Sequence, residues 1–451
     1  MSAQNTIQTA MPSAPDPVEL LQQLIRFNTS NPPGHEKECM LYIQQCLHTA
    51  GIETQLFHKD PDRPNLVARL SGKKESAGGA APLLIYAHVD VVAASPEGWT
   101  YPPFEGKIAD GYLWGRGALD MKGAVAMMIC AFIKAKKENV ALPGDVILCL
   151  LSDEEELGEY GARFMVEHHA DLFKGVRFAL GEFGGFSLFV GGKKFYPIEV
   201  MQKQKCIIKA VITGDSGHGS AYVKGGTMAK LAHMLHQMDT HLLPVHITTA
   251  VHKMFTAIAA ASPFPTGVIL RQLLNPRRTD FVLQRILKEK GSAFVPMFHN
   301  TVNATIIRGG QKINVIPDRI EVEMDVRLLP GFKPEDVIAE LRAIIGPHIS
   351  LEVLLYDPTP PEPNMALFDT LAGILKEADP QGIPVPLLLT GSSDARFFSR
   401  LGIQTYGFIP MQLPEEMNFN RTIHAVNERI PVATLSFGTD ALYKAISTFS
   451  Q

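Results

Sequence analysis

Residues 83–122, LLIYAHVDVVAASPEGWTYPPFEGKIADGYLWGRGALDMK, contain the pattern that decides the fold. The stretch opens with an apolar run, residues 83–86, that is typical of a buried strand. His88 and Asp90 follow this run, and because side chains alternate along a strand, both point to the same face at its end. That arrangement suits a metal-binding imidazole whose other ring nitrogen is held by a carboxylate. Asp120 then precedes a predicted helix over residues 121–137.

Two further acidic groups follow apolar segments that read as strands. The run VILCLLS leads to the four acids at residues 153–156, and residues 178–180 are followed by Gly181 and Glu182. Taken singly, a His-x-Asp pair is more often a surface pair, an aspartate before a helix is more often a cap, and an acidic run is usually a solvated helix start. Their order favours one common site, because parallel α/β sheets place ligands at the carboxyl ends of strands.

Five short motifs carry a resemblance to a known family. HVDVV, GRGALDMKG, SDEEELGEYGA, GHGS and IHAVNE are similar to the motifs of the M20 family of metallopeptidases. The resemblance runs from about Pro17 to the C-terminus and includes FNTSNPPG at residues 27–34. It implies an α/β fold, with a zinc-exopeptidase-like catalytic domain whose mostly parallel sheet lies between helices, and an inserted α+β domain for dimerisation that acts as a lid. The chain is most similar to the carboxypeptidase and N-acyl-amino-acid hydrolase branch.

The predicted domain organisation follows from this resemblance and from changes in composition. We expect a disordered leader at residues 1–16, a catalytic metal-binding domain formed by residues 17–200 and 358–451, and an inserted dimerisation domain at residues 201–357. Four prolines within residues 357–364 resemble a hinge. Residues 242–300 form a long extension in which helices are expected around residues 250–261 and 280–290, without assigned chemistry.

Composition excludes several classes of partner and location. The chain has 42 basic against 46 acidic side chains, which gives no electrostatic case for nucleic acid. It has no apolar stretch of about 18 residues, so no transmembrane helix is indicated. The start of the chain lacks the basic and apolar segments of a secretory signal, which predicts a cytoplasmic protein. The five cysteines are scattered, so neither a disulfide framework nor a thiolate zinc site is expected.

The resemblance implies two Zn²⁺ ions per subunit, and the same ligands also suit Co²⁺ or Mn²⁺. It assigns five ligands: His88, Asp120, Glu155, Glu182 and His424. Asp120 would bridge the two ions, which lie about 3.5 Å apart in dinuclear hydrolases. Asp90 would orient His88. A cis peptide bond after Asp120 is also implied.

Glu154 stands next to the ligand Glu155, and this pair suggests a division of roles. A carboxylate that stays free beside the metals can take a proton from an activated water and pass it to the leaving amine. The family's DEE pattern matches residues 153–155 and makes Glu154 the general base. Because Glu156 follows, a shifted register with Glu155 as base and Glu156 as ligand stays open.

Further residues are assigned by the resemblance to substrate binding. His218, in GHGS, would reach the active site of a second subunit and stabilise the oxyanion, which implies a homodimer. Read alone, His218 is a loop histidine. Arg327 would clamp the substrate carboxylate, because a guanidinium fork matches a carboxylate, although a strand-end arginine also suits a surface pair. Asn303 would help to bind the reacting carbonyl, and the loop with Gly391 and Ser392 would line the carboxylate pocket.

The sequence therefore predicts a metal-dependent hydrolase that cleaves an amide bond next to a free α-carboxylate, as a carboxypeptidase or dipeptidase does. Its substrate would be a small peptide or an N-acyl amino acid. The alternative within enzymes is an N-acyl-amino-acid amidohydrolase, an aminoacylase or deacetylase with the same chemistry. A catalytically silent metal-binding dimer would be expected to lose Glu154 or a ligand, and a dinuclear phosphoesterase fits neither the DEE pair nor the GHGS insertion.

Overall fold

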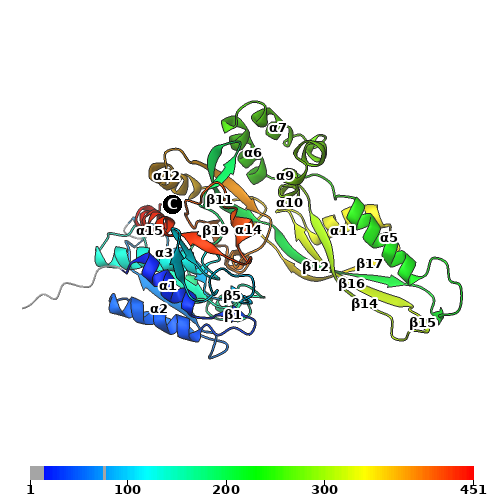
Figure 1. The fold of residues 1–451 in the computed structure, drawn as a ribbon, viewed down its shortest axis with the longest axis horizontal. Helices are drawn as coiled ribbons and strands as arrows, with labels where there is room; N and C mark the ends of the chain where they lie inside the picture. The colour runs from blue at the N-terminus through cyan, green and yellow to red at the C-terminus, as the bar shows by residue number, and fades with distance from the viewer. Residues whose placement is uncertain (1–14, 75–77, 451) are drawn as a thin grey trace, which may run out of the picture.

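The computed structural model describes residues 15–74 and 78–450, so that most of the leader expected at residues 1–16 lies outside it. Two separate sheets dominate the fold (Figure 1). A nine-stranded sheet lies among the N- and C-terminal helices, and a four-stranded sheet lies at the other end of an elongated molecule.

The nine-stranded sheet confirms the α/β prediction. Its four central strands run parallel, and antiparallel strands flank them on both sides. The order is β10 (Leu188–Val190), β11 (Lys193–Gln202), β19 (Gln404–Gly407), β9 (Phe178–Gly181), β4 (Leu83–His88), β8 (Val146–Leu151), β3 (Asn65–Leu70) and β2 (Thr54–Phe57), and β18 (Ile383–Leu389) pairs with β11. Both β4 and β8 are buried along their whole length, because helices cover both faces of the sheet.

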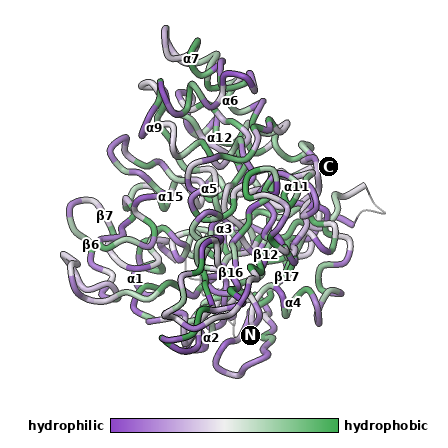
Figure 2. Tube along the Cα trace, turned by 90° about the vertical axis from the view of Figure 1, so that its right-hand side faces the viewer, coloured by the Kyte–Doolittle hydropathy of each residue, from purple (hydrophilic) through white to green (hydrophobic). Residues whose placement is uncertain are grey.

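Helices from distant parts of the chain cover the two faces of this sheet. The first face carries α1 (Pro17–Arg26), α2 (Lys37–Thr49), α3 (Lys122–Lys137), α12 (Phe368–Ala378) and α15 (Val432–Thr448). The second carries α4 (Ala162–His168) and α13 (Ala395–Phe398), with a 3-10 turn at Ala170–Phe173. Almost every residue of α3 is buried, and Figure 2 shows α3 near the centre of the molecule. The apolar sequence of α3 therefore reflects a core helix.

The four-stranded sheet is antiparallel throughout, with the order β14 (Thr301–Gly309), β16 (Arg319–Leu328), β12 (Gln204–Thr213) and β17 (Ser350–Asp357). One face packs on α5 (Thr227–Thr240) and α11 (Pro334–Ile345). Burial alternates along β16, as expected for a sheet with one covered face. Beyond it, β13 (Gly217–His218) pairs with β15 (Val315–Ile316).

The extension at residues 242–300 is helical and belongs to the core of the larger sheet. It contains α6 (Thr249–Ala261), α7 (Thr266–Gln272), α8 (Thr279–Phe281), a π-helical turn at Val282–Leu287, α9 (Glu289–Ser292) and α10 (Val295–Phe298). The helix α6 packs on β18 and β11, and Phe255 and Phe298 are buried in the same cluster as α3. This part of the expected insertion therefore covers the nine-stranded sheet (Figure 1). The boundaries of the domains stay a prediction.

The ten-residue strand β11 was not predicted. It contains Pro197, and a bulge between Glu199 and Met201 interrupts its alternation, so the sequence shows no clean period of two. All five cysteines are free, as expected. Among the described helices, none has the length and apolarity needed to cross a membrane.

Candidate functional site

Three neighbouring strands deliver the acidic and imidazole side chains to one edge of the large sheet. His88 ends β4, the acids at residues 153–156 follow β8, and Glu182 follows β9. Since these strands are parallel, their carboxyl ends meet at the same edge. Asp120 arrives at the start of α3, and the peptide bond that follows it is cis, as the resemblance implies. His424 comes from the loop between α14 (Phe419–Thr422) and β20 (Arg429–Pro431).

Asp120 lies between the two histidines, with one carboxylate oxygen toward each. Its Oδ1 is 3.3 Å from His88 Nε2, and its Oδ2 is 3.2 Å from His424 Nε2. Glu182 Oε2 lies 3.5 Å from His88 Nε2, and Glu155 Oε2 lies 3.3 Å from His424 Nε2. The structure thus brings together all five residues that the sequence assigned as ligands.

Two overlapping groups have the geometry to hold a metal ion. One consists of His88, Asp120 and Glu155, and the other of His88, Glu154 and Glu182. Glu154 therefore lies within ligand distance of the same centre, with its Oε2 4.0 Å from His88 Nε2. Glu156 is exposed and belongs to neither group, which argues against the shifted register.

The donor set fits divalent cations. His88 Nε2, Glu155 Oε1 and Glu182 Oε1 are buried and have no hydrogen-bond partner. Buried polar atoms nearly always have a hydrogen-bond partner. Three unpaired atoms of metal-binding types in one cluster therefore indicate that a cation binds among them. Imidazole nitrogen and carboxylate oxygen are the ligands that zinc takes in catalytic sites.

The charges of the cluster are unbalanced without such a cation. Burial raises the pKa of Glu155 to about 7, and burial together with the neighbouring Glu154 raises the pKa of Glu182 well above its usual range. Hydrogen bonds to Asp120 and Glu155 raise the pKa of His424 to about 10. Burial alone would lower the pKa of His88, but the adjacent carboxylates of Asp120, Asp90 and Glu182 raise it well above its usual value. The carboxylates attract positive charge, whether from protons or from metals.

Asp90 contacts both His88 and the turn that carries Glu154 and Glu155. His88 Nδ1 lies 3.0 Å from the backbone oxygen of Asp90 and 3.5 Å from its carboxylate. The carboxylate instead accepts hydrogen bonds of 3.1 Å each from the backbone N–H groups of Glu154 and Glu155. Asp90 therefore positions the turn that carries both glutamates as well as the imidazole.

The sequence interpretation missed several buried residues that support this turn. Asn31 donates to the carboxylates of Asp90 (2.9 Å) and Asp153 (3.0 Å), and the buried Arg63 pairs with Asp153 and Glu36. Asn31 falls in FNTSNPPG, a motif to which the sequence assigns no contact. Since these contacts join residues far apart in the chain, no local pattern indicates them.

Glu428 was also missed, although it lies in IHAVNE. Its buried carboxylate pairs with Arg116 at 2.6 Å and accepts hydrogen bonds from the backbone N–H groups of Gly117, Leu119 and Asp120. Glu428 therefore fixes the loop that presents Asp120.

Arg327 and Ser392, which the resemblance assigned to substrate binding, lie together. Arg327 Nη1 donates to Ser392 Oγ at 2.7 Å, and its Nε and Nη2 donate to Asp325. Arg396, which was not predicted, is buried and also donates to Ser392 Oγ at 3.3 Å. Gly391 is exposed on the same loop. Asp394 follows in this loop with both carboxylate oxygens buried and unpaired.

His218 and Asn303 are not joined to the cluster. His218 is exposed and its Nδ1 lies 2.8 Å from Ser220 Oγ, while Asn303 is exposed on the edge strand β14. Among the contacts of the described residues, none links either side chain to the metal-binding groups. Figure 1 places β15, the partner of β13, at the end of the molecule away from the large sheet.

Comparison with known proteins places this site in a family. A model of the peptidase family M20/M25/M40 matches residues 84–448. The human N-fatty-acyl-amino acid synthase/hydrolase PM20D1 is 29% identical over 406 residues, covering 87% of this chain and 78% of the relative. The succinyl-diaminopimelate desuccinylase of Paracoccus denitrificans is 27% identical over 441 residues, covering 93% of this chain and 95% of the relative.

Solved structures share the fold. The M20 family metallo-carboxypeptidase Sso-CP2 of Sulfolobus solfataricus has a TM-score of 0.66 at 18% identity, over 96% of this chain and 99% of that one. A dinuclear metal-binding peptidase of the M20 family from Bacillus subtilis has a TM-score of 0.58 at 14% identity, over 96% of each chain. The family match spans most of the chain and includes all five candidate ligand positions. The chain belongs to peptidase family M20/M25/M40 and is a hydrolase with peptidase or amidase activity.

Proposed function

We propose that this hydrolase uses two metal ions to cleave an amide bond next to a free α-carboxylate. The observation that carries the proposal is the position of Asp120, with one carboxylate oxygen toward each of two imidazoles. His88 and Glu182 would be the remaining protein ligands of one ion, and Glu155 and His424 those of the other. Zinc suits these nitrogen and oxygen ligands, and cobalt and manganese are alternatives.

Bound metals would lower the pKa of a water molecule and polarise the amide carbonyl. Glu154 would accept the proton of that water and deliver it to the leaving amine. Its position supports this role, because it is mostly enclosed and lies beside His88 without a hydrogen bond of its own to Asp120 or His424. Burial raises the pKa of Glu154, which favours a carboxyl group that can both take up and release a proton.

Arg327 and Ser392 would receive the carboxylate of the substrate. One edge of the guanidinium, formed by Nε and Nη2, donates to Asp325, which aligns the group, and Nη1 donates to Ser392. A substrate carboxylate at this point can accept from Arg327 and from the serine hydroxyl together. Arg396 adds a second buried guanidinium to the same serine.

We also propose a homodimer through the four-stranded sheet. His218 would act in the active site of a second copy, where it would stabilise the oxyanion together with Asn303. The exposure of His218, with no contact to the site of its own chain among the described residues, supports this assignment.

An N-acyl-amino-acid amidohydrolase is the second candidate. The human relative is a hydrolase of N-fatty-acyl-amino acids and the bacterial relative removes a succinyl group, whereas the similar solved structures include a carboxypeptidase. A carboxypeptidase and an amidohydrolase share the same bond chemistry and differ in what occupies the acyl side.

The deciding experiment measures release of free amino acid from matched dipeptides and N-acyl amino acids. The wild type is assayed with zinc and again after chelation. The Glu154→Gln variant is assayed with zinc. Turnover that chelation abolishes and that the Glu154→Gln variant lacks supports the proposed chemistry. The substrate of the panel that is cleaved fastest shows whether an aminoacyl or another acyl group occupies the acyl side of the amide bond. Turnover that survives both chelation and the substitution contradicts it.

A further inference from the structure

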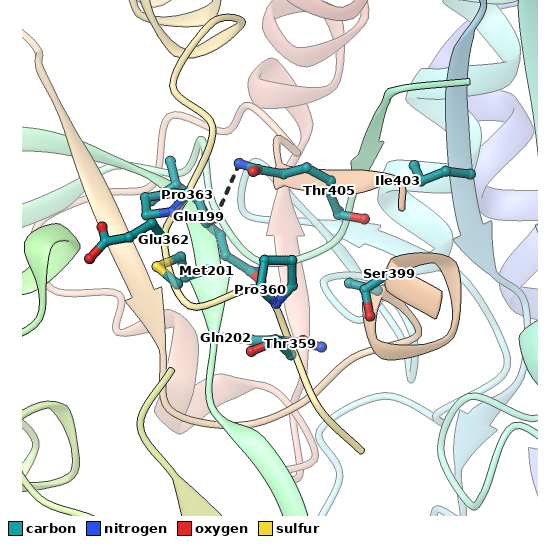
Figure 3. Close-up of a pocket in the computed structure, with 13 residues that line it drawn as sticks. Glu199, Met201, Gln202, Thr359, Pro360, Glu362, Pro363, Ser399, Ile403 and Thr405 are labelled. Carbon is teal, nitrogen blue, oxygen red and sulfur yellow. Dashed lines mark hydrogen bonds between the residues drawn. The ribbon is translucent and has the colours of Figure 1, made fainter. Parts of the chain in front are cut away.

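The helical extension at residues 242–300 differs in charge from the rest of the chain. It contains seven of the 42 basic side chains and only two of the 46 acidic ones, Asp280 and Glu289, so the remainder of the chain is acidic. The pocket drawn in Figure 3 belongs to that remainder, and its lining includes the acids Glu199 and Glu362 but no lysine, arginine or histidine. Positive charge is therefore concentrated on the extension.

The extension also exposes apolar side chains at one end of the molecule. Phe264, which lies between Pro263 and Pro265 just before α7, is 86% exposed. Phe281 at the end of α8 is 62% exposed, and Val268 on α7 is 54% exposed. Figures 1 and 2 view the molecule from directions 90° apart, and both place α7 at its upper extremity. These side chains can therefore enter an apolar phase without a change in the fold.

Arginines share the exposed faces of these apolar side chains. On α7, Arg271 follows Val268 by three residues. Around α8 and the π-helical turn that continues it, Arg278 lies three residues before Phe281, and Arg285 lies four residues after it. Helical residues at these spacings are neighbours on one face. Each helical segment therefore presents apolar and basic side chains together.

The two helical segments form one surface. Arg278 Nη1 donates a hydrogen bond of 2.5 Å to Gln272 Oε1 at the end of α7. Gln272 in turn lines an open hollow together with Phe264 and Val268. We call this surface the basic tip and define it by Phe264, Val268, Arg271, Arg278, Phe281 and Arg285.

The three arginines of the basic tip have no acidic partner in the described part of the chain. Asp280 is close to them in the sequence, but its Oδ1 lies 3.0 Å from His299 Nε2. Among the described residues, no ion pair involves any of the three arginines. Their guanidinium groups are therefore available to anions from outside the chain.

The turn between β10 and β11 lies beside the basic tip and adds a further cation. A Cβ atom built on Gly191 would lie 3.6 Å from Pro263 and 3.5 Å from Thr266, so this turn reaches the start of α7. Lys193, two residues further along, is exposed and has no ion pair among the described residues. Basic side chains from two separate segments therefore lie at this end of the molecule.

We propose that the basic tip binds the surface of a lipid bilayer that contains anionic headgroups. The guanidinium groups bind the phosphates of the headgroups, while Phe264 and Phe281 enter the boundary between headgroups and acyl chains. The same surface repels the acidic remainder of the chain, which turns the tip toward the bilayer. A bilayer fits better than a protein partner, because arginines alternate with the apolar side chains across the tip. No residue assigned to the metal ions or to the substrate takes part.

Cosedimentation of the metal-loaded full-length protein with sucrose-loaded vesicles tests this proposal. One set of vesicles is phosphatidylcholine alone, and the other contains about one third phosphatidylglycerol, which supplies negative charge. We expect binding to the anionic vesicles that weakens as the salt concentration rises, and binding to the neutral vesicles that is weaker by about tenfold or more. Because this experiment measures no turnover, its failure is distinct from a failure of the proposed hydrolase chemistry.

Substitutions separate the electrostatic and apolar parts of the tip. The triple variant Arg271→Gln, Arg278→Gln, Arg285→Gln should weaken binding to the anionic vesicles roughly a hundredfold. Phe264→Ser and Phe281→Ser keep the charge, and each should weaken binding about tenfold. All five side chains are exposed, so the variants should keep the wild-type fold, which circular dichroism verifies.

The matched control makes the same change of charge elsewhere. It combines Lys59→Gln, Lys107→Gln and Lys174→Gln, at three exposed lysines outside the extension, and should bind nearly as the wild type does. Absence of binding, equal binding to both kinds of vesicle, or an equal loss in the control would overturn the proposal. So would a loss in the arginine variant that neither phenylalanine variant shows, because the tip would then recognise charge alone, as on an acidic protein.

Discussion

Arg327 at the end of β16 donates a hydrogen bond of 2.7 Å to Ser392, a residue of the loop that follows β18 of the other sheet. This contact joins the two sheets at the point where the substrate carboxylate is proposed to bind. Asp325 holds the remaining edge of the guanidinium through Nε and Nη2. Arg327 is thus oriented before any ligand arrives.

Arg327→Lys is expected to raise KM on the order of tenfold, with a smaller change in kcat, because lysine keeps the charge and loses the planar fork. Steady-state kinetics on the preferred substrate measures the changes in KM and kcat separately. Arg308→Lys, at an exposed arginine on β14, serves as the control. An unchanged KM for Arg327→Lys would place the carboxylate elsewhere.

Glu154→Gln is expected to lower kcat by about a hundredfold to ten-thousandfold, because the amide cannot accept a proton. Metal content, measured by elemental analysis, should stay at the wild-type level. Glu156→Gln is the matched control at the next but one position and should keep full activity, since Glu156 is exposed. Loss of metal and activity in Glu156→Gln, with Glu154→Gln still active, would favour the shifted register.

Chelation is expected to abolish turnover and to lower the melting temperature, because the buried carboxylates then face one another without a cation. Differential scanning calorimetry before and after dialysis against chelator measures the second effect. Readdition of zinc, cobalt or manganese should restore both, and the order of recovered activities ranks the metals. A melting temperature that chelation leaves unchanged would contradict a bound dinuclear centre.

Arg63→Met is expected to destabilise the fold by about 3–5 kcal/mol, because it leaves two buried carboxylates, Glu36 and Asp153, without their cation. Urea denaturation measures the free energy of unfolding. Lys37→Met removes an exposed ion pair with Asp62 and should change stability by less than about 1 kcal/mol. Equal effects of the two variants would show that the buried network adds nothing.

Lys203 makes stability depend on pH at the crossing from β11 to β12. Burial lowers the pKa of Lys203 to about 7, and its Nζ donates to His299 and Thr301. Between pH 7 and the ordinary lysine pKa, the unfolded chain binds more protons than the folded chain, so the stability contribution rises with pH and is lost as pH falls toward 7.

Between pH 7 and pH 9, the free energy of unfolding of the wild type should therefore rise by roughly 2 kcal/mol relative to that of Lys203→Met. Urea denaturation at both pH values measures the difference. Lys312→Met, at an exposed lysine, should show no such gain. A pH-independent difference between the wild type and Lys203→Met would mean that Lys203 titrates normally.

The sequence alone determined the α/β class and most strands and helices of the large sheet, which depend on local patterns such as the apolar runs of β4 and β8. The five candidate ligands came from the resemblance of short motifs to those of a known family. His88, Glu155 and Glu182 could be proposed together because parallel strands necessarily deliver their carboxyl ends to one edge. The strand β11 escaped this reasoning, because a bulge and a proline remove its period of two.

Only the tertiary structure decided how the site is supported and what surrounds it. Asn31, Arg63 and Glu428 act on residues between 27 and 312 positions away, and no local pattern encodes such contacts. The packing of α6 is a further example. Its apolar face predicts that the helix packs against the protein core, but not which of the two sheets it covers. Burial and unpaired hydrogen-bonding atoms, such as those of Glu182 and Asp394, are likewise properties of the folded chain. Local sequence specifies secondary structure and motifs, whereas long-range packing determines which side chains share one enclosed space.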